Sequence, residues 1–333
     1  MTTPAEKYAA AKLRGQHPIT TEFLLTFDFE FDPFQISACH AVEDGKGVLV
    51  AAPTGAGKTV VGEFAAYFAL QAGKKCFYTT PIKALSNQKY SEFVAKFGED
   101  RVGLLTGDTS INGEADILVM TTEVLRNMLY AGSNTLTNLG CVVMDEVHYL
   151  ADKFRGAVWE EVLIHLMESV QVISLSATVS NAEEFGEWLG EVRGDTEVIV
   201  SEIRPIPLFQ HVLIGSRLMD LFEQPGKINP EILQREREAI RRSSLGRNRR
   251  GRFAEPSDRM SRADIIEKLQ RENLLPAITF IFSRVGCDAA VKQCLHAGLR
   301  LTSPEERAEI RQTALRYTQN IAEEDLEVLN FKE

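Results

Sequence analysis

The sequence predicts an α/β fold, with a parallel sheet covered by helices on both faces and a phosphate loop after its first strand. Short apolar runs alternate with amphipathic segments between residues 47 and 200, the pattern of repeated βα units. In addition, the segment 47–59, GVLVAAPTGAGKT, passes from an apolar run through a glycine-bearing loop into an amphipathic stretch. Strand, loop and helix in this order are the context that a phosphate loop requires.

The residue types of this loop suit phosphate binding. Gly55 and Gly57 would let backbone N–H groups close on the phosphates at the positive end of the next helix. Lys58 would reach the β- and γ-phosphate oxygens, and Thr59 would offer its hydroxyl group to Mg²⁺. The segment fits the relaxed pattern A/G-x-x-x-x-G-K-S/T, and an ordinary glycine turn is the alternative. The residues expected to bind ATP here are Ala52, Pro53, Thr54, Gly55, Ala56, Gly57, Lys58 and Thr59.

The other elements follow in βα order. The expected strands are 75–80, 102–106, 116–121, 141–146, 170–176 and 196–200, and the expected helices are 60–70, 84–97, 122–130, 158–167 and 182–189. Short apolar strands between amphipathic helices indicate a parallel sheet that is buried on both faces. Such sheets place their chemistry at the carboxyl ends of the strands, so the residues after each apolar run are the candidates.

Two candidate groups follow later strands. Asp145 and Glu146 end the run 141–144; Asp145 would hold Mg²⁺ largely through water, and Glu146 would orient and deprotonate the attacking water. A solvated helix cap is the alternative for this acidic pair. His148 follows closely and could equally be a surface or core histidine. The tripeptide SAT at 176–178 ends the next run, and by itself it could be a turn before a helix.

The residues ahead of the loop are candidates for adenine binding. Phe27, Phe29 and Phe31 alternate with acidic residues, which predicts an extended, half-buried segment that stops at Asp32-Pro33. The amide of Gln35 and an exposed face of Phe29 could read the Watson–Crick edge and the π-face of adenine. Aromatic packing at the edge of the domain is the alternative.

Composition limits the class of protein. The 333 residues are 44% hydrophobic and 25% charged, which is ordinary globular material with room for two domains. The net charge of −10 means that any nucleic-acid contact must come from a local surface. Five scattered cysteines indicate neither a zinc site nor a disulfide framework. Without a membrane-length apolar run or a signal-peptide core, we expect a cytoplasmic protein with no membrane contact.

Seven segments in one order resemble the motifs of superfamily 2 helicases of the DExH-box class: FDPFQ, APTGAGKT, TTPIKAL, LLTGDTSIN, VMTTEVLRNML, DEVH and SAT. DEVHYLADKFRGAVWEE and SLSATVSNAEEFGEWLG look closest to the Ski-type RNA helicases, and within them to the actinobacterial HelY-type branch. The resemblance covers residues 25–215. It implies a RecA-like domain that uses ATP and Mg²⁺ and binds single-stranded nucleic acid, with RNA favoured over DNA.

The resemblance also implies roles for individual residues. Phe29 and Gln35 would take the adenine. The catalytic residues would be Lys58, Asp145 and Glu146, and the metal would lie at Thr59 and Asp145. The residues coupling the nucleotide state to the domain interface would be His148, Ser176 and Thr178.

Strand ends away from the nucleotide would hold the sugar-phosphate backbone in such a family. Hydroxyls, helix N-termini and exposed amides bind phosphates without reading bases. Each of these residues could instead be a helix cap or a turn residue. They are Pro81, Lys83, Gly107, Thr121 and Thr122.

The character of the chain changes beyond residue 200. Ten arginines between 235 and 262 predict a flexible, solvated loop that could add nucleic-acid affinity. A buried strand at 277–282 and a helix at 285–295 resemble the opening of a second RecA-like domain, and a helical stretch at 303–319 follows. The expected domains are an N-terminal extension (1–24), a first RecA-like ATP-binding domain (25–215), an arginine-rich linker (216–263) and the start of a truncated second RecA-like domain (264–333).

In the family that the chain resembles, the second domain supplies arginine fingers from a G-R-x-G-R-x-G element, which does not occur after Arg284. Loss of a finger costs on the order of 10³ to 10⁵ in rate, so we expect this chain to bind ATP, hydrolyse it poorly and not unwind. A phosphate-loop kinase or transport ATPase is one alternative, which the seven ordered motifs argue against. A nucleotide-gated nucleic-acid clamp without unwinding activity is another.

Overall fold

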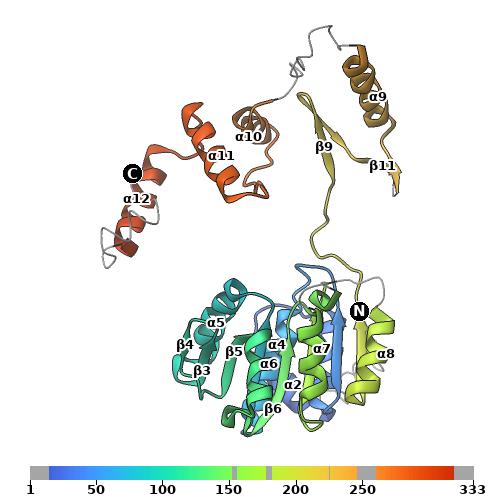
Figure 1. The fold of residues 1–333 in the computed structure, drawn as a ribbon, viewed down its shortest axis with the longest axis vertical. Helices are drawn as coiled ribbons and strands as arrows, with labels where there is room; N and C mark the ends of the chain where they lie inside the picture. Colours follow the sequence, from blue (N-terminus) through green and yellow to red (C-terminus); the bar gives the residue numbers. More distant parts are fainter. Residues whose placement is uncertain (1–14, 152–155, 178–181, 225, 246–259, 319–333) are drawn as a thin grey trace. The chain divides into compact units, whose positions relative to one another are not determined.

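The computed structural model describes residues 15–151, 156–177, 182–224, 226–245 and 260–318. The chain divides into two compact units, residues 1–207 and 208–333 (Figure 1). All the predicted site residues belong to the first unit. Among the described residues, no helix combines the length and the apolar character needed to cross a membrane.

The first unit is built on an eight-stranded sheet of order β4-β3-β5-β2-β6-β7-β1-β8. All neighbouring strands are parallel except β3 and β4, so the predicted parallel sheet is confirmed. The strands are β1 Gly47–Ala51, β2 Lys75–Thr80, β3 Val102–Leu105, β4 Ser110–Ile111, β5 Ile117–Thr121, β6 Leu139–Met144, β7 Gln171–Ser176 and β8 Thr196–Val200.

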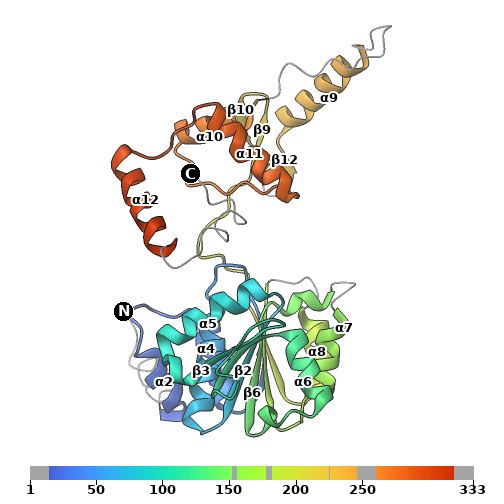
Figure 2. The same cartoon turned by 60° about the vertical axis from the view of Figure 1, so that its left-hand side comes forward.

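Helices cover both faces of this sheet (Figure 2). Alternation along each strand sends neighbours to opposite cores: Val48 and Val50 pack on one face, and Leu49 packs on the other. On the face of Val48 lie α2 Pro18–Leu24, α3 Pro33–Glu43, α4 Thr59–Gln71 and α5 Lys83–Phe97; on the face of Leu49 lie α6 Thr122–Ala131, α7 Gly156–His165 and α8 Ala182–Arg193. Short 3₁₀ turns are η1 Glu99–Arg101, η2 Asn134–Leu136 and η3 Val147–Ala151.

Among its described residues, the second unit contains two small antiparallel ribbons and four helices. The ribbons pair β9 His211–Ile214 with β10 Arg217–Asp220, and β11 Phe222–Gln224 with β12 Lys227–Ile228. The helices are α9 Pro230–Leu245, α10 Arg262–Arg271, α11 Arg284–His296 and α12 Pro304–Thr318. The helices predicted at 285–295 and 303–319 are therefore present.

The predicted buried strand at 277–282 is wrong. These residues form no strand, and Ile278, Phe280 and Phe282 are 82%, 82% and 105% exposed. A strand needs a neighbour for its backbone hydrogen bonds. Within the part of the chain that the structure describes, the strands of this unit pair with one another, and none pairs with 277–282.

Two other local features differ from the expectations. Helix α2 was not predicted, and it forms because the Glu43 carboxylate accepts the N–H groups of Ile19 and Thr20 at 3.0 and 2.8 Å. These donors would otherwise be unsatisfied at the helix N-terminus. The arginine-rich loop is also wrong for 235–245, which belongs to α9; there Arg235 pairs with Glu231 one turn earlier. Residues 246–259 lie outside the described residues.

We expect Gly103→Ala to destabilise the first unit by about 1–3 kcal/mol, because added atoms in a packed core force the backbone to move. A Cβ on Gly103 in β3 would lie 2.2 Å from the carbonyl oxygen of Asn112 and 2.6 Å from Cδ2 of Leu118. Urea unfolding of the full chain measures this. Gly190→Ala in α8 is the control, since its Cβ meets nothing within 4 Å and should stabilise the helix slightly. Equal midpoints for the two variants would contradict the prediction.

Candidate nucleotide-binding site

The parallel strands end at one edge of the sheet, and the strand order divides that edge into two halves. Strands β6, β7 and β1 lead into the acidic pair, the SAT segment and the phosphate loop. Strands β3, β5 and β2 lead into the residues predicted to contact nucleic acid. The two predicted functions therefore occupy adjacent stretches of the same edge.

The loop after β1 has the backbone of a phosphate cradle. Gly55 and Gly57 have φ values of 86° and 81°, in the left-handed region that glycine adopts without steric cost. Helix α4 begins at Thr59, so the loop lies at a helix N-terminus. The N–H of Ala52 donates to the carbonyl of Ser176 at 3.2 Å, which attaches the start of the loop to the end of β7.

The side chain of Lys58 contacts the start of this loop. Its Nζ donates to the carbonyl oxygens of Ala52 at 2.8 Å and Pro53 at 3.1 Å. Burial lowers the pKa of the Lys58 ammonium, and the charges of Glu146 and Asp145 oppose that shift. Glu146 and Asp145 therefore lie near enough to this ammonium for their charges to act on it.

The acidic pair has a constrained geometry. The Asp145 carboxylate accepts the Tyr78 hydroxyl at Oδ2 (2.7 Å) and the N–H of Glu146 at Oδ1 (2.9 Å). Glu146 has φ 55°, a left-handed conformation that costs a residue with a Cβ about 1–2 kcal/mol. Nδ1 of His148 lies 3.3 Å from Oε2 of Glu146, without the alignment of a hydrogen bond. The structure thus brings His148 beside Glu146.

Sequence reasoning missed Tyr78, which reads as a core residue within the apolar run of β2. The side chain is fully buried. Burial, and then the charge and hydrogen bond of Asp145, raise the pKa of Tyr78 well above its ordinary value, so the phenol remains a donor. A buried tyrosine hydroxyl requires a partner, which was the one signal available in the sequence.

The two adenine candidates differ in their surroundings. Phe29 is 55% exposed, and its ring packs against Phe31 with centroids 4.7 Å apart. Gln35 is buried: its Oε1 accepts the N–H of Asp32 at 2.9 Å, and its Nε2 donates to the carbonyls of Gly57 (3.0 Å) and Ala56 (3.3 Å). Gln35 therefore holds the phosphate loop in place, and its contact with adenine remains a prediction.

The residues of this site fit Mg²⁺. The Thr59 hydroxyl and the Asp145 carboxylate are oxygen ligands, and Mg²⁺ prefers one or two of these together with water and phosphate oxygens. Nζ of Lys89 on α5 lies 3.4 Å from the Thr59 hydroxyl. Oγ of Ser176 is buried and has no hydrogen-bond partner among the described residues. Thr178 lies outside them.

The nucleic-acid candidates on the other half of the edge are partly engaged. Lys83 pairs with Asp108, and hydrogen bonds from Lys83 and then Thr106 lower the pKa of Asp108. The Thr122 hydroxyl is buried and donates to the Thr80 carbonyl at 3.3 Å. Thr121 is the N-cap of α6, Gly107 is exposed, and Pro81 is buried.

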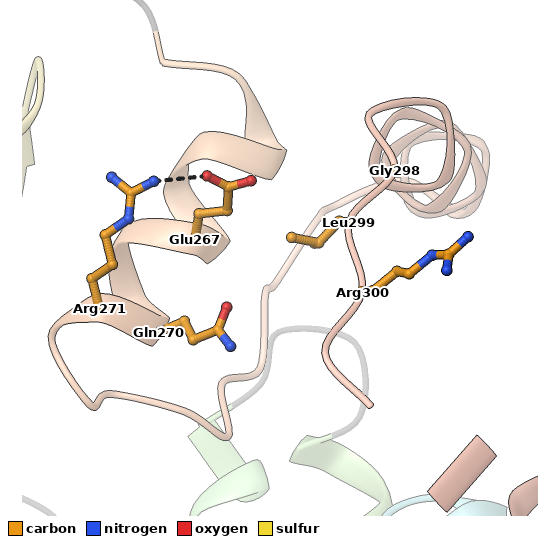
Figure 3. A pocket seen from close by; sticks show the side chains of 6 residues that line it. All are labelled: Glu267, Gln270, Arg271, Gly298, Leu299 and Arg300. Carbon is orange, nitrogen blue, oxygen red and sulfur yellow. Dashed lines mark hydrogen bonds and ion pairs between the residues drawn. The ribbon is translucent and has the colours of Figure 1, made fainter. Parts of the chain in front are cut away.

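Two hollows in the second unit contain none of these residues. One, of about 330 Å³, is lined by Glu267, Gln270, Arg271, Gly298, Leu299 and Arg300, with Arg271 and Glu267 paired at 3.0 Å (Figure 3). The other, of about 380 Å³, is apolar and lies between α10 and α11. Neither hollow is lined by any of the predicted site residues at the sheet edge.

A glycine-rich loop and an acidic pair at the carboxyl edge of one parallel sheet form the arrangement of a RecA-like ATP-binding domain. Residues 32–185 match the family model of the DEAD/DEAH box helicases, so this part of the chain is a DEAD/DEAH box helicase domain.

Three curated relatives are similar over most of the chain. "Probable helicase HelY" of Mycobacterium tuberculosis is 56% identical and covers 93% of this chain, which spans 36% of that protein. "DExH-box ATP-dependent RNA helicase DExH15 chloroplastic" of Arabidopsis thaliana is 42% identical, with 81% and 26% covered. "Superkiller complex protein 2" of Mus musculus is 40% identical, with 85% and 24% covered. These similarities confirm the resemblance to Ski-type DExH-box helicases, and the chain spans about a quarter to a third of each relative.

Proposed function

We propose that this chain carries the ATP site of an ATP-dependent nucleic-acid helicase that acts on RNA. The observation that carries the proposal is that the loop bearing Lys58, after β1, and the pair Asp145 and Glu146, after β6, leave the same edge of the sheet, with β7 between their strands. A triphosphate in the glycine cradle would lie between the loop cation and the two carboxylates. The Arabidopsis thaliana relative is named as an RNA helicase, which supports RNA as the substrate class.

Each residue of the site would have a separate role in ATP hydrolysis. Lys58 and the backbone N–H groups of the loop would bind and orient the β- and γ-phosphates. Glu146 would hold the attacking water and accept its proton. Thr59 and Asp145 would hold Mg²⁺, which supplies charge neutralisation at the phosphate oxygens when bound. Phe29 and Gln35 would take the adenine, and His148 with Ser176 would relay the nucleotide state.

The other half of the edge would bind one strand of nucleic acid through its backbone. The Lys83 ammonium, which pairs with Asp108, would exchange that carboxylate for a phosphate. The buried hydroxyl of Thr122 already has a partner, so this position would act through the N–H groups at the start of α6. Such contacts bind strands without sequence preference.

The proposal is tested by measuring fluorescent-ATP binding and then strand binding on the 333-residue chain, with single-stranded RNA and DNA of one sequence. We expect saturable ATP binding that requires the loop, and RNA affinity that changes when ATP is bound and exceeds that for DNA. Absence of ATP binding would overturn the proposal. Equal affinity for RNA and DNA would remove the RNA assignment and leave the ATP site intact.

A further inference from the structure

Tyr78 lies where the half of the sheet edge that carries Asp145 meets the half predicted to bind nucleic acid. It lies on β2, which pairs with β6 on one side and β5 on the other, and its hydroxyl donates to Oδ2 of Asp145 at 2.7 Å. We propose that Tyr78 is a positioning residue that fixes the orientation of the Asp145 carboxylate for the metal. This inference rests on the proposed function and adds a residue that none of the seven motifs contains.

The ring of Tyr78 is held rigidly, which is what a positioning role requires. The side chain is 0% exposed. A Cβ on Gly62 of α4 would lie 2.8 Å from Cε2 of this ring, so the absence of a side chain there lets the ring pack against the helix that follows the phosphate loop. On another side, Phe93 of α5 meets the ring edge-on with centroids 5.1 Å apart. A ring fixed by two helices presents its hydroxyl group in one direction.

The hydroxyl group complements the backbone support of Asp145. The N–H of Glu146 holds Oδ1, the hydroxyl of Tyr78 holds Oδ2, and the N–H of Asp145 itself donates to the carbonyl of Thr79 at 2.9 Å. Each carboxylate oxygen keeps a further lone pair for metal-bound water. Without the hydroxyl, the carboxylate could rotate about its Cβ–Cγ bond. Loss of such an outer partner of a metal ligand typically costs about 10–100-fold in metal affinity.

The test is a Mn²⁺ titration followed by electron paramagnetic resonance, with a non-hydrolysable ATP analogue at saturation. We expect Tyr78→Phe to weaken Mn²⁺ affinity about tenfold, with metal-free nucleotide affinity unchanged and the melting temperature modestly lower, because the variant loses a buried hydrogen bond to a carboxylate. Tyr67→Phe is the matched control, because the Tyr67 hydroxyl on α4 also meets a carboxylate, that of Glu22. This control should bind Mn²⁺ as the wild type does.

A second variant disturbs the ring without removing the hydroxyl. Gly62→Ala should displace the Tyr78 ring, lower Mn²⁺ affinity several-fold, and add no further loss in a Tyr78→Phe background, because both changes act through one hydrogen bond. Wild-type Mn²⁺ affinity in Tyr78→Phe, or full additivity of the two changes, would overturn the inference. If the wild-type chain binds neither Mn²⁺ nor the nucleotide, the proposed function itself fails.

Discussion

Lys58→Ala is expected to weaken ATP binding by roughly 10- to 100-fold and to remove measurable hydrolysis. A hydrogen bond to a charged group contributes about 1.5–3 kcal/mol, and about 1.4 kcal/mol corresponds to a factor of ten. Nζ of Lys58 donates to the carbonyl oxygens of Ala52 and Pro53. The ammonium is therefore held at the start of the glycine loop, with the charges of Glu146 and Asp145 acting on it. Fluorescent-ATP titration of the full chain measures the loss.

Lys46→Ala is the matched control. Lys46 pairs with Glu197 at 3.1 Å and precedes β1, so the variant removes the same charge at the opposite end of the same strand. Its ATP affinity should equal that of the wild type. An equal loss in both variants would mean that net charge, and not the loop contact, determines affinity. If Lys58→Ala leaves RNA binding intact and independent of ATP, a nucleotide-gated clamp becomes the better description.

The sequence was sufficient for the architecture of the first unit because its signals are local. The apolar runs of β1, β2, β5, β6 and β7 are buried on both faces of a parallel sheet, and the amphipathic segments between them fix which residues face the two cores. Parallel strands then bring their carboxyl ends to one edge. Lys58 and Asp145 are distant in the chain, yet this rule predicts that they lie at the same edge of the sheet.

The failures of prediction arise where a distant partner decides the local structure. Helix α2 depends on the Glu43 carboxylate, which lies 24 residues after Ile19 and has no signature in the segment itself. The apolar run 277–282 has strand propensity, but the described residues supply no neighbouring strand. Tyr78 has the composition of a core residue, and the acidic partner that gives it a second role is 67 residues away.

The backbone of Glu146 is a further feature that sequence reasoning could not supply. With φ 55°, this residue occupies a conformation in which glycine would be the unstrained choice. Its N–H donates to Oδ1 of Asp145 from that conformation, and its negative charge partly offsets the lowering of the Lys58 pKa by burial. A strained residue that keeps an acidic side chain at a reactive edge suggests that the side chain is required for chemistry.

Glu146→Gln is accordingly expected to reduce single-turnover ATP hydrolysis by about 10²–10⁴-fold, the usual contribution of a general base. ATP affinity should stay the same or rise, because glutamine keeps the shape of the side chain and removes a negative charge that repels the triphosphate. Rapid-quench or long-incubation assays with protein in excess give the rate, and fluorescent-ATP titration gives the affinity. Glu114→Gln is the control, since Glu114 pairs with Lys75 near the amino ends of the strands. A Glu146→Gln rate within threefold of the wild type would mean that another group accepts the proton.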